Sequence, residues 1–326
     1  MIAALCEKFG PPENLILREL PDPKAGQGEV VVAPTRVALN FFDTLIIENK
    51  YQHKPAPPFS PGAEFCGRII ALGAGVEGFE LGQRVAGFCS YGAARSRLVL
   101  PAARLSAVPD ELTDDQAAGL FVTYGTTLHA LRQRANLQGG ETLAVLGASG
   151  GVGLAAVEIG AAMGAHVIAC ASSPEKLDFA QSHGARDRID YSREDLKEAL
   201  KNLTDRKGVD CVYDAIGGAS SEAALRAMAW KGRFLVVGFA SGEIPKIPLN
   251  LLLLKGCAVL GVFWDEFVKR EPQTHLDNMT CLLDWTARGV LSAHVHAVYP
   301  LAEIAQALDV LKERKAQGKI LLSIPE

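Results

Sequence analysis

The sequence has no excess of basic residues, no signal-like N-terminus and no long uninterrupted hydrophobic segment. Its 326 residues carry 33 lysines and arginines against 37 aspartates and glutamates, a net charge of −4, which argues against a nucleic-acid-binding surface. The longest apolar stretch, residues 151–171, is interrupted by Glu158 and His166, so we expect no membrane span. The N-terminus lacks a basic segment followed by an apolar core, so we expect no signal peptide and a cytoplasmic protein.

The seven cysteines are scattered along the chain and include no C-x-x-C pair. They are Cys6, Cys66, Cys89, Cys170, Cys211, Cys257 and Cys281. We interpret them as small buried hydrophobic residues of a protein in a reducing compartment. His294 and His296 could place two imidazoles on one face of a strand, but no third metal ligand stands near them, which favours an ordinary structural role.

What the sequence does contain is a glycine-rich turn, LAVLGASGGVGL, at residues 143–154. An apolar run leads into glycines, and small residues follow Gly153, as is typical of a strand, a tight turn and a helix whose N-terminus binds a pyrophosphate. Gly150 and Gly153 align with the last two glycines of G-x-G-x-x-G, and Ala148 stands in the first position. The predicted cofactor-binding residues of this turn are Ala148, Gly150, Gly151 and Val152.

Strands and helices alternate after the turn. Apolar runs predict strands at residues 166–171, 188–191, 209–214, 232–238 and 257–263. One helix is predicted to begin at Pro174, and three more are predicted at residues 193–203, 221–229 and 249–254. This alternation predicts a parallel sheet covered on both faces, in an α/β, doubly wound dinucleotide-binding domain of the Rossmann type.

The same turn also fits G-x-S-x-G, the nucleophile elbow of a serine hydrolase, with Ser149 as the nucleophile. Asp265 followed by His294 or His296 would give the chain order of such a triad. Gly153 extends the glycine pattern beyond what an elbow needs, and the following segments have the rhythm of a dinucleotide-binding fold. The sequence therefore favours the cofactor site and leaves the hydrolase as a minor alternative.

The end of the second strand indicates which cofactor is bound. NAD-specific sites carry an acid there that accepts hydrogen bonds from the ribose hydroxyl, whereas this chain has Ala171, Ser172 and Ser173, with Lys176 following. Two hydroxyls and an ammonium could hold a 2′-phosphate, and Tyr191 could add a donor. We therefore predict NADPH rather than NADH. In the alternative interpretation, Ser172 is only a helix cap and Lys176 a solvated surface residue.

A chain of this length should contain a second domain, and the segment before residue 120 differs in composition. Short β-rich runs broken by proline and glycine predict a compact, barrel-like β domain there. Helices are expected at residues 114–120, 125–134, 279–288 and 301–314, and a closing strand at residues 319–324. The predicted division is 1–122 for the β-rich domain, 123–263 for the dinucleotide-binding domain, and 264–326 as a return to the first.

Five short motifs, together with the glycine turn, make the chain recognisable. They are LNFFDT at 39–44, PGAEF at 61–65, TYGTT at 123–127, VVGF at 236–239 and QGK at 317–319. Over essentially its whole length the chain resembles the medium-chain dehydrogenase/reductase superfamily, and within it the zinc-independent quinone oxidoreductases of the zeta-crystallin type. The resemblance implies a GroES-like catalytic domain, interrupted by a Rossmann domain and completed by the tail.

Within that superfamily, metal content separates two kinds of enzyme. The zinc alcohol dehydrogenases carry a cysteine near the position of Asn40 and a histidine in Gly-His-Glu, where this chain has Ala63 between Gly62 and Glu64. The cysteine cluster of the structural zinc is represented only by Cys89. We therefore expect no metal.

Without a Lewis acid, an alkoxide is poorly stabilised, and alcohol oxidation is disfavoured. A quinone or an α,β-unsaturated carbonyl spreads the incoming charge by conjugation, so hydride transfer to such an acceptor needs mainly positioning and polarisation. By the resemblance, Asn40, Tyr51 and Thr126 surround the nicotinamide and the acceptor as the catalytic residues. Asp43 and Glu64 are expected to order the pocket wall rather than to move protons.

The resemblance implies further cofactor contacts and leaves the acceptor open. The residues concerned are Asn40, Thr126, Phe239, Phe263 and Lys319. Leu45 stands where quinone reductases of this type often carry tyrosine, which makes the pocket more apolar. A 2-alkenal or enoyl-thioester (enoyl-CoA) reductase and a non-catalytic NADPH-binding protein remain the alternatives. The apolar strand at residues 257–263 should form a sheet edge, which predicts a homodimer.

Overall fold

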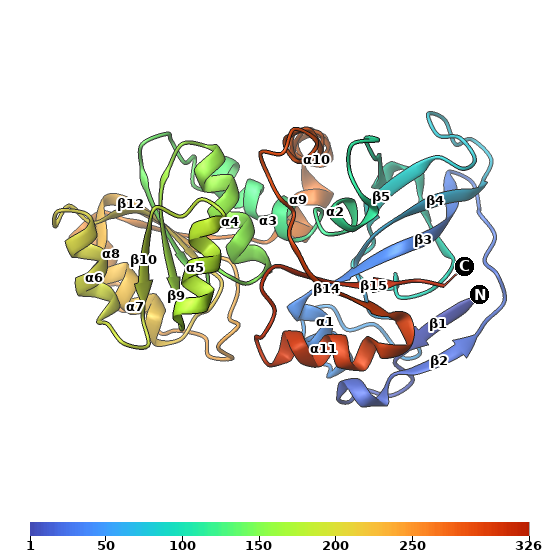
Figure 1. The fold of residues 1–326 in the computed structure, drawn as a ribbon, viewed down its shortest axis with the longest axis horizontal. Helices are drawn as coiled ribbons and strands as arrows, with labels where there is room; N and C mark the ends of the chain where they lie inside the picture. The colour runs from blue at the N-terminus through green and yellow to red at the C-terminus, as the bar shows by residue number, and fades with distance from the viewer. Residues whose placement is uncertain (326) are drawn as a thin grey trace. The chain divides into compact units, whose positions relative to one another are not determined.

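The computed structural model describes residues 1–325, which form two compact units (Figure 1). Unit 1 comprises Met1–Val122, Met279–Arg288 and the chain from Ala293 onward, and unit 2 comprises Thr123–Asn278 and Gly289–Ser292. Among the described residues, no helix is both long and apolar enough to cross a membrane.

Unit 1 is built on a largely antiparallel sheet with the strand order β14-β15-β3-β4-β5-β7, in which β6 also pairs with β3. Its strands are β3 Glu29–Leu39, β4 Glu64–Leu72, β5 Arg84–Phe88, β6 Leu98–Pro101, β7 Leu105–Ala107, β14 Val295–Pro300 and β15 Lys319–Ser323. A separate hairpin pairs β1 Ile2–Leu5 with β2 Ile16–Glu19. The helices are α1 Phe41–Ile47, α2 Asp114–Ala118 and α11 Ile304–Lys312, with short 3-10 turns at Pro12–Asn14, Ala102–Arg104 and Leu301–Glu303.

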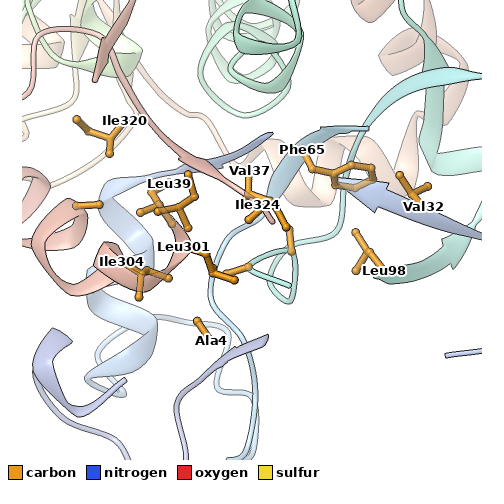
Figure 2. Packing of buried hydrophobic residues seen from close by; sticks show 14 of the residues in the cluster. Ala4, Val32, Val37, Leu39, Phe65, Leu98, Leu301, Ile304, Ile320 and Ile324 are labelled. Atoms are coloured by element: carbon orange, nitrogen blue, oxygen red, sulfur yellow. The ribbon is translucent and has the colours of Figure 1, made fainter. Parts of the chain in front are cut away.

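The tail completes the core of unit 1. Strand β15 pairs antiparallel with β3, so that Leu321 faces Ala38 and Leu322 faces Val37. Figure 2 shows Leu301 and Ile304 from the tail beside Leu39 of β3 in the buried cluster. The alternation of apolar residues along β3 and β15 places one face of each strand in this cluster. The β-rich GroES-like domain predicted from the sequence is confirmed.

Unit 2 contains a six-stranded, wholly parallel sheet in the order β10-β9-β8-β11-β12-β13. The strands are β8 Thr142–Leu146, β9 His166–Ala171, β10 Asp187–Asp190, β11 Val209–Asp214, β12 Met228–Val236 and β13 Ala258–Gly261. Numbered from β8, this order is 3-2-1-4-5-6, which is typical of dinucleotide-binding folds. The predicted Rossmann domain is confirmed, and β13 lies at the sheet edge as expected.

The helices of unit 2 pack on this sheet: α4 contacts β8 and β9, α7 contacts β11 and β12, and α8 contacts β12 (Figure 1). They are α4 Gly151–Ala162, α5 Pro174–Ser182, α6 Leu196–Leu203, α7 Ala219–Arg226 and α8 Asn250–Lys255. Helix α6 begins three residues later than predicted, because Asp195 caps it by accepting a hydrogen bond from the Glu198 N–H at 2.8 Å.

Unit 2 also differs from the sequence-based expectation in one helix and in its extent. The single helix expected at residues 125–134 consists of α3 Thr123–Leu128 and a π-helical turn, His129–Arg134, whose Ala135 N–H donates to the Ala130 carbonyl at 2.8 Å. Unit 2 also extends past residue 263 through α9, Trp264–Arg270, and the start of α10, Pro272–Ala287. Residues 264–278, which the sequence analysis assigned to the return to the first domain, are grouped with unit 2.

The cause of this extension is the packing of Trp264. A Cβ added at Gly125 of α3 would lie only 2.9 Å from the Trp264 ring, so the indole lies directly on the helix backbone. Residues 289–292 also belong to unit 2, since the Ser292 N–H donates to the buried Glu158 carboxylate at 3.1 Å. Only residues 279–288 and the chain from Ala293 return to unit 1.

Candidate active site

The glycine turn of unit 2 has the geometry of a phosphate-binding loop. The N–H groups of Gly147 and Ala148 donate to the Cys170 carbonyl at 2.9 and 3.2 Å, and Gly147 has φ +76°. A Cβ at Gly153 would lie 2.0 Å from the Gly147 carbonyl oxygen, so α4 can approach β8 only with glycine at this position.

Gly150 is different, because no atom in the described part of the chain lies close enough to require a glycine there. It caps α4 with φ −77°, and the nearest atom to an added Cβ, the Gly147 carbonyl oxygen, lies 3.7 Å away. A side chain at this position would instead fill the space at the start of a 12-residue helix, where free N–H groups and the positive end of the helix dipole favour an anion. The residues present therefore fit a pyrophosphate.

The predicted cofactor residues of unit 2 gather at one edge of its sheet. Ala148, Ser172, Phe239 and Phe263 follow the carboxyl ends of β8, β9, β12 and β13, and Tyr191 follows β10. Because these strands are parallel, their carboxyl ends share the edge at which doubly wound sheets bind ligands.

The end of β9 corrects one detail of the sequence interpretation. The N-cap of α5 is Ser173, which accepts a hydrogen bond from the Lys176 N–H at 3.4 Å, whereas Ser172 is exposed and is not the cap. Glu175 lies in the first turn of α5, where its own backbone N–H and the Ser173 hydroxyl lower the pKa of its carboxyl.

Arg193 is a cation near this strand end that the sequence interpretation missed. Its charge also lowers the pKa of Glu175, and its Nε lies 3.6 Å from Asp190 with a side chain that is 72% exposed. Arg193 stands two residues after Tyr191, just past the end of the third strand, and this position could have identified it as a candidate cofactor contact.

Thr126 is half-buried on α3, and its neighbour Thr127 ties that helix to the glycine turn. The Thr127 hydroxyl donates to the Thr123 carbonyl at 2.7 Å and lies 3.3 Å from the Val152 carbonyl and 2.8 Å from the Tyr213 hydroxyl. The buried Thr127 therefore has a structural role, and Thr126 is the threonine with partial exposure.

Ser149, the nucleophile of the serine hydrolase alternative, is buried. Asp265, the acid of that alternative, forms an ion pair with Lys269 at 2.5 Å, one turn along α9.

In unit 1, four polar side chains form a buried network around Asn40. The Asn40 amide donates to the Glu64 carboxylate at 3.0 Å, and the Lys319 ammonium donates to the Asn40 side-chain oxygen at 2.7 Å and to Glu64 at 2.6 Å. The other Glu64 oxygen accepts from the Val122 N–H at 2.8 Å. Every member is thus paired, as buried charges require.

Asp43 completes this network from the first turn of α1. Its two oxygens accept from the N–H groups of Asn40 at 2.7 Å and Gly62 at 2.9 Å. Burial raises the pKa of this carboxyl to about 7, although both hydrogen bonds lower it. Asp43 therefore holds the entry to α1 and the loop before β4 in place.

Lys319 was expected to contact the cofactor, but the structure gives its ammonium other partners. Besides Asn40 and Glu64, it donates to the Leu39 carbonyl at 3.4 Å, which occupies all three of its hydrogens, and the side chain is 3% exposed. We therefore assign Lys319 to the Asn40 network.

The donor set of unit 1 does not fit zinc. In the region from residue 1 to 325, no group of three histidine, cysteine or acidic side chains could hold a metal ion. Asn40 and Ala63 stand where the zinc relatives carry ligands, and the Lys319 ammonium beside Asn40 would repel a cation. Burial raises the pKa of the nearby Cys89 thiol to about 12, which disfavours the thiolate that zinc needs.

Tyr51 belongs to a group of aromatic rings in unit 1. Its ring stacks on Phe42 at 5.2 Å between centroids and 19° between planes, and lies 5.9 Å from His53. Leu45 is half-buried on the same helix as Phe42. Flat aromatic surfaces of this kind suit a planar conjugated ligand.

Comparisons with known proteins agree with this architecture. Residues 26–110 match the alcohol dehydrogenase GroES-like domain family, and residues 151–280 match the zinc-binding dehydrogenase family. A quinone oxidoreductase-like protein 2 homolog of Nematostella vectensis is 37% identical over 98% of this chain and 88% of its own length. A quinone oxidoreductase of Pseudomonas aeruginosa is 35% identical over 96% of this chain and 97% of its own.

Solved structures are similar along the whole chain. The Escherichia coli quinone oxidoreductase complexed with NADPH aligns with a TM-score of 0.92 and 28% identity, covering 99% of this chain and 100% of that one. The CurK enoyl reductase aligns with a TM-score of 0.90 and 27% identity, covering 99% of each chain.

Proposed function

This chain belongs to the zinc-independent quinone oxidoreductase family of the medium-chain dehydrogenases and reductases, and we propose that it reduces a quinone or a similar conjugated carbonyl with NADPH and without a metal. The observation that carries the proposal is the buried amide of Asn40. It is held between a carboxylate and an ammonium, 3.0 and 2.7 Å away, in place of a metal site.

The cofactor proposal follows from the carboxyl edge of the parallel sheet. A reduced nicotinamide, when bound, supplies a hydride. The turn residues Ala148, Gly150, Gly151 and Val152 would hold the pyrophosphate, and Thr126, Phe239 and Phe263 would lie toward the nicotinamide. Ser172, Ser173, Lys176 and Tyr191, with Arg193 nearby, supply hydroxyls and positive charge for a 2′-phosphate. Two acids also lie at this strand end, Glu175 and Asp190, and Asp190 pairs with Arg193. The hydroxyls and the two cations favour NADPH over NADH.

The acceptor proposal follows from the Asn40 amide and the aromatic rings. One Asn40 N–H can polarise a carbonyl oxygen, while conjugation in the acceptor spreads the negative charge that arrives with the hydride. The stacked rings of Tyr51 and Phe42 offer a flat surface for a quinone, and the Tyr51 hydroxyl would be a further donor to the developing oxyanion. Asp43 and Glu64 accept hydrogen bonds and shape this wall without moving a proton.

A second candidate is the reduction of a 2-alkenal or an enoyl thioester. Leu45 makes the wall more apolar than a tyrosine would, which suits an alkyl chain better than a polar ring. The similarity to the CurK enoyl reductase supports this candidate as well.

We further propose a homodimer joined along β13. Within residues 1–325 this strand pairs only with β12, so one row of its backbone groups lies at an open edge, and Val259 is 39% exposed. Three neighbouring apolar side chains on β12 and α8 are also exposed: Trp230 at 67%, Leu253 at 80% and Leu254 at 71%. The same strand of a second copy would cover such an edge by extending the sheet.

Steady-state assays with a panel of acceptors test the function. We expect NADPH-dependent reduction of 1,4-benzoquinones or 1,4-naphthoquinones with a higher kcat/KM than for 2-alkenals and crotonyl-CoA. A higher kcat/KM for the alkenals or the thioester would establish the second candidate instead. Tight NADPH binding without turnover of any acceptor would contradict both and indicate a non-catalytic binding protein.

A further inference from the structure

The chemistry of its partners fixes the orientation of the Asn40 amide. A lysine ammonium can only donate hydrogen bonds, and an ionised carboxylate can only accept them. The side-chain oxygen of Asn40 must therefore face Lys319, 2.7 Å away, and its nitrogen must face Glu64, 3.0 Å away. The flipped amide would place an N–H against the ammonium and an oxygen against the carboxylate.

The register of the sheet in unit 1 brings these three residues together. Ile320 of β15 faces Leu39 of β3, and Ala38 of β3 faces Glu64 of β4, so Lys319, Asn40 and Glu64 lie at the same end of three adjacent strands. A Cβ at Gly119 would lie 3.2 Å from the Lys319 Cγ, so this glycine leaves room for the lysine stem.

The orientation decides what Asn40 can offer a ligand. Its Nδ2 carries two hydrogens, and Glu64 takes one of them. The second has no partner among residues 1–325, and Asn40 keeps 6% of its surface exposed. The ammonium that binds the amide oxygen also draws electrons from the amide, which strengthens this remaining N–H as a donor.

We propose that Lys319 is a positioning residue that acts through Asn40. It locks and polarises the amide so that Asn40 meets the carbonyl oxygen of the acceptor only as a hydrogen-bond donor. Negative charge grows on that oxygen as hydride arrives, so the polarised N–H acts mainly on kcat. The inference rests on the proposed function and adds to it the residue that replaces the polarising effect of a metal ion.

A double-mutant cycle tests the proposal with the wild type, Asn40→Ala, Lys319→Met and the double variant, using the best quinone of the panel and NADPH. Asn40→Ala should lower kcat by about 100-fold, as loss of an oxyanion donor does, and Lys319→Met by about tenfold. Since Lys319 acts through Asn40, the double variant should be no slower than Asn40→Ala within about twofold. The NADPH dissociation constant should change by less than about twofold in all of them.

Lys312→Met is the matched control. It also removes a lysine paired with a glutamate in unit 1, Glu48 at 2.7 Å, but on an exposed helix face, and it should leave kcat unchanged. The proposal is overturned if the fold-decrease of kcat in the double variant equals the product of the decreases in the two single variants. It is also overturned if the NADPH dissociation constant rises by as much as kcat falls. If the wild type reduces no acceptor, the proposed function fails and the inference fails with it, whereas an active wild type with independent losses contradicts the inference alone.

A second measurement needs no substitution at Lys319. In the asparagine-¹⁵N-labelled wild type bound to NADP⁺, adding the quinone should shift one of the two Asn40 side-chain amide proton signals downfield, and Asn40→Ala identifies them. If the quinone binds and neither Asn40 amide proton signal shifts, the assignment of Asn40 as the donor is contradicted.

Discussion

At the scale of single residues, charge determines what the site around Asn40 can hold. The Lys319 ammonium nitrogen lies 2.6 Å from a Glu64 carboxylate oxygen, and the two side chains are 3% and 0% exposed. Removing one partner of a buried pair leaves the other charge unpaired and costs about 3–5 kcal/mol. The network is therefore stable only as a whole.

Lys176 should bind the 2′-phosphate of the cofactor. Lys176→Ala removes one charge-assisted contact, worth on the order of 1.5–3 kcal/mol, and should raise the NADPH dissociation constant at least about tenfold while leaving NADH nearly untouched. Fluorescence titration with both cofactors measures this, with Lys197→Ala of α6 as the control. Equal weakening of both cofactors would show that Lys176 supports the fold.

The sequence could predict the cofactor-binding residues of unit 2 because they lie close together along the chain. Ser172, Ser173 and Lys176 follow one strand within a few positions, so their proximity was predictable. The Asn40 network was not, because Lys319 lies 279 positions from Asn40 and 255 from Glu64, and only strand pairing brings them together. Lys319 was therefore recognised by its motif, but its partners were not.

At the scale of elements, the glycine turn gives a matched pair of substitutions. Gly153→Ala places a Cβ 2.0 Å from the Gly147 oxygen and should destabilise the protein by about 1–3 kcal/mol. Gly150→Ala meets nothing closer than 3.7 Å, so its thermal midpoint should stay at the wild-type value while NADPH binding weakens. Calorimetry and titration separate the two effects. A Gly150→Ala protein with normal NADPH affinity would exclude this turn as the pyrophosphate site.

The contact between the π-helical turn and α9 should make the protein sensitive to acid. His129 stacks on Phe267 at 3.8 Å, its Nδ1 is buried without a partner, and burial lowers its pKa to about 4. The unfolded pKa is about 6.5, so the neutral ring stabilises the fold above that pH, and this contribution is lost as pH falls toward 4. At pH 5 the loss is about 2 kcal/mol.

His129→Phe should remove this loss. Urea denaturation at pH 7 and pH 5 should show a smaller decrease in unfolding free energy for the variant than for the wild type. The comparison between proteins is needed because Asp43, with its pKa raised to about 7, titrates in the opposite sense and loses stability as pH rises from about 4 to 7. Identical decreases in both proteins would show that His129 does not titrate in this range.

Strands were more predictable than helices in this chain. The strands at 166–171 and 209–214 match the predicted bounds because apolar runs end at glycine or polar residues. Helix α9 was missed because four of its seven residues are charged and its two buried residues, Trp264 and Phe267, are too few to show a helical period. The π-helical turn has no sequence period of its own, since the 3.6-residue pattern continues through it.

At the scale of the whole molecule, the open edge of β13 should determine assembly. Val259→Pro removes a backbone donor from that edge and should convert a dimer into a monomer. Light scattering at micromolar concentration should give twice the 34.7 kDa chain mass for the wild type and a single chain mass for the variant. Val298→Pro, on the edge strand β14 and also at a 39% exposed valine, is the control that should stay dimeric. A monomeric wild type would rule the dimer out.

The central claim is hydride transfer to a conjugated carbonyl without a metal, and turnover by exhaustively chelated protein tests it most directly. Wild-type protein dialysed against EDTA and 1,10-phenanthroline, and assayed with NADPH and a quinone, should keep its full kcat and contain less than about 0.1 zinc per chain by elemental analysis, because Asn40, Ala63 and the Lys319 ammonium offer no zinc site. Loss of activity on chelation that Zn²⁺ restores, with one zinc bound per chain, would contradict the account.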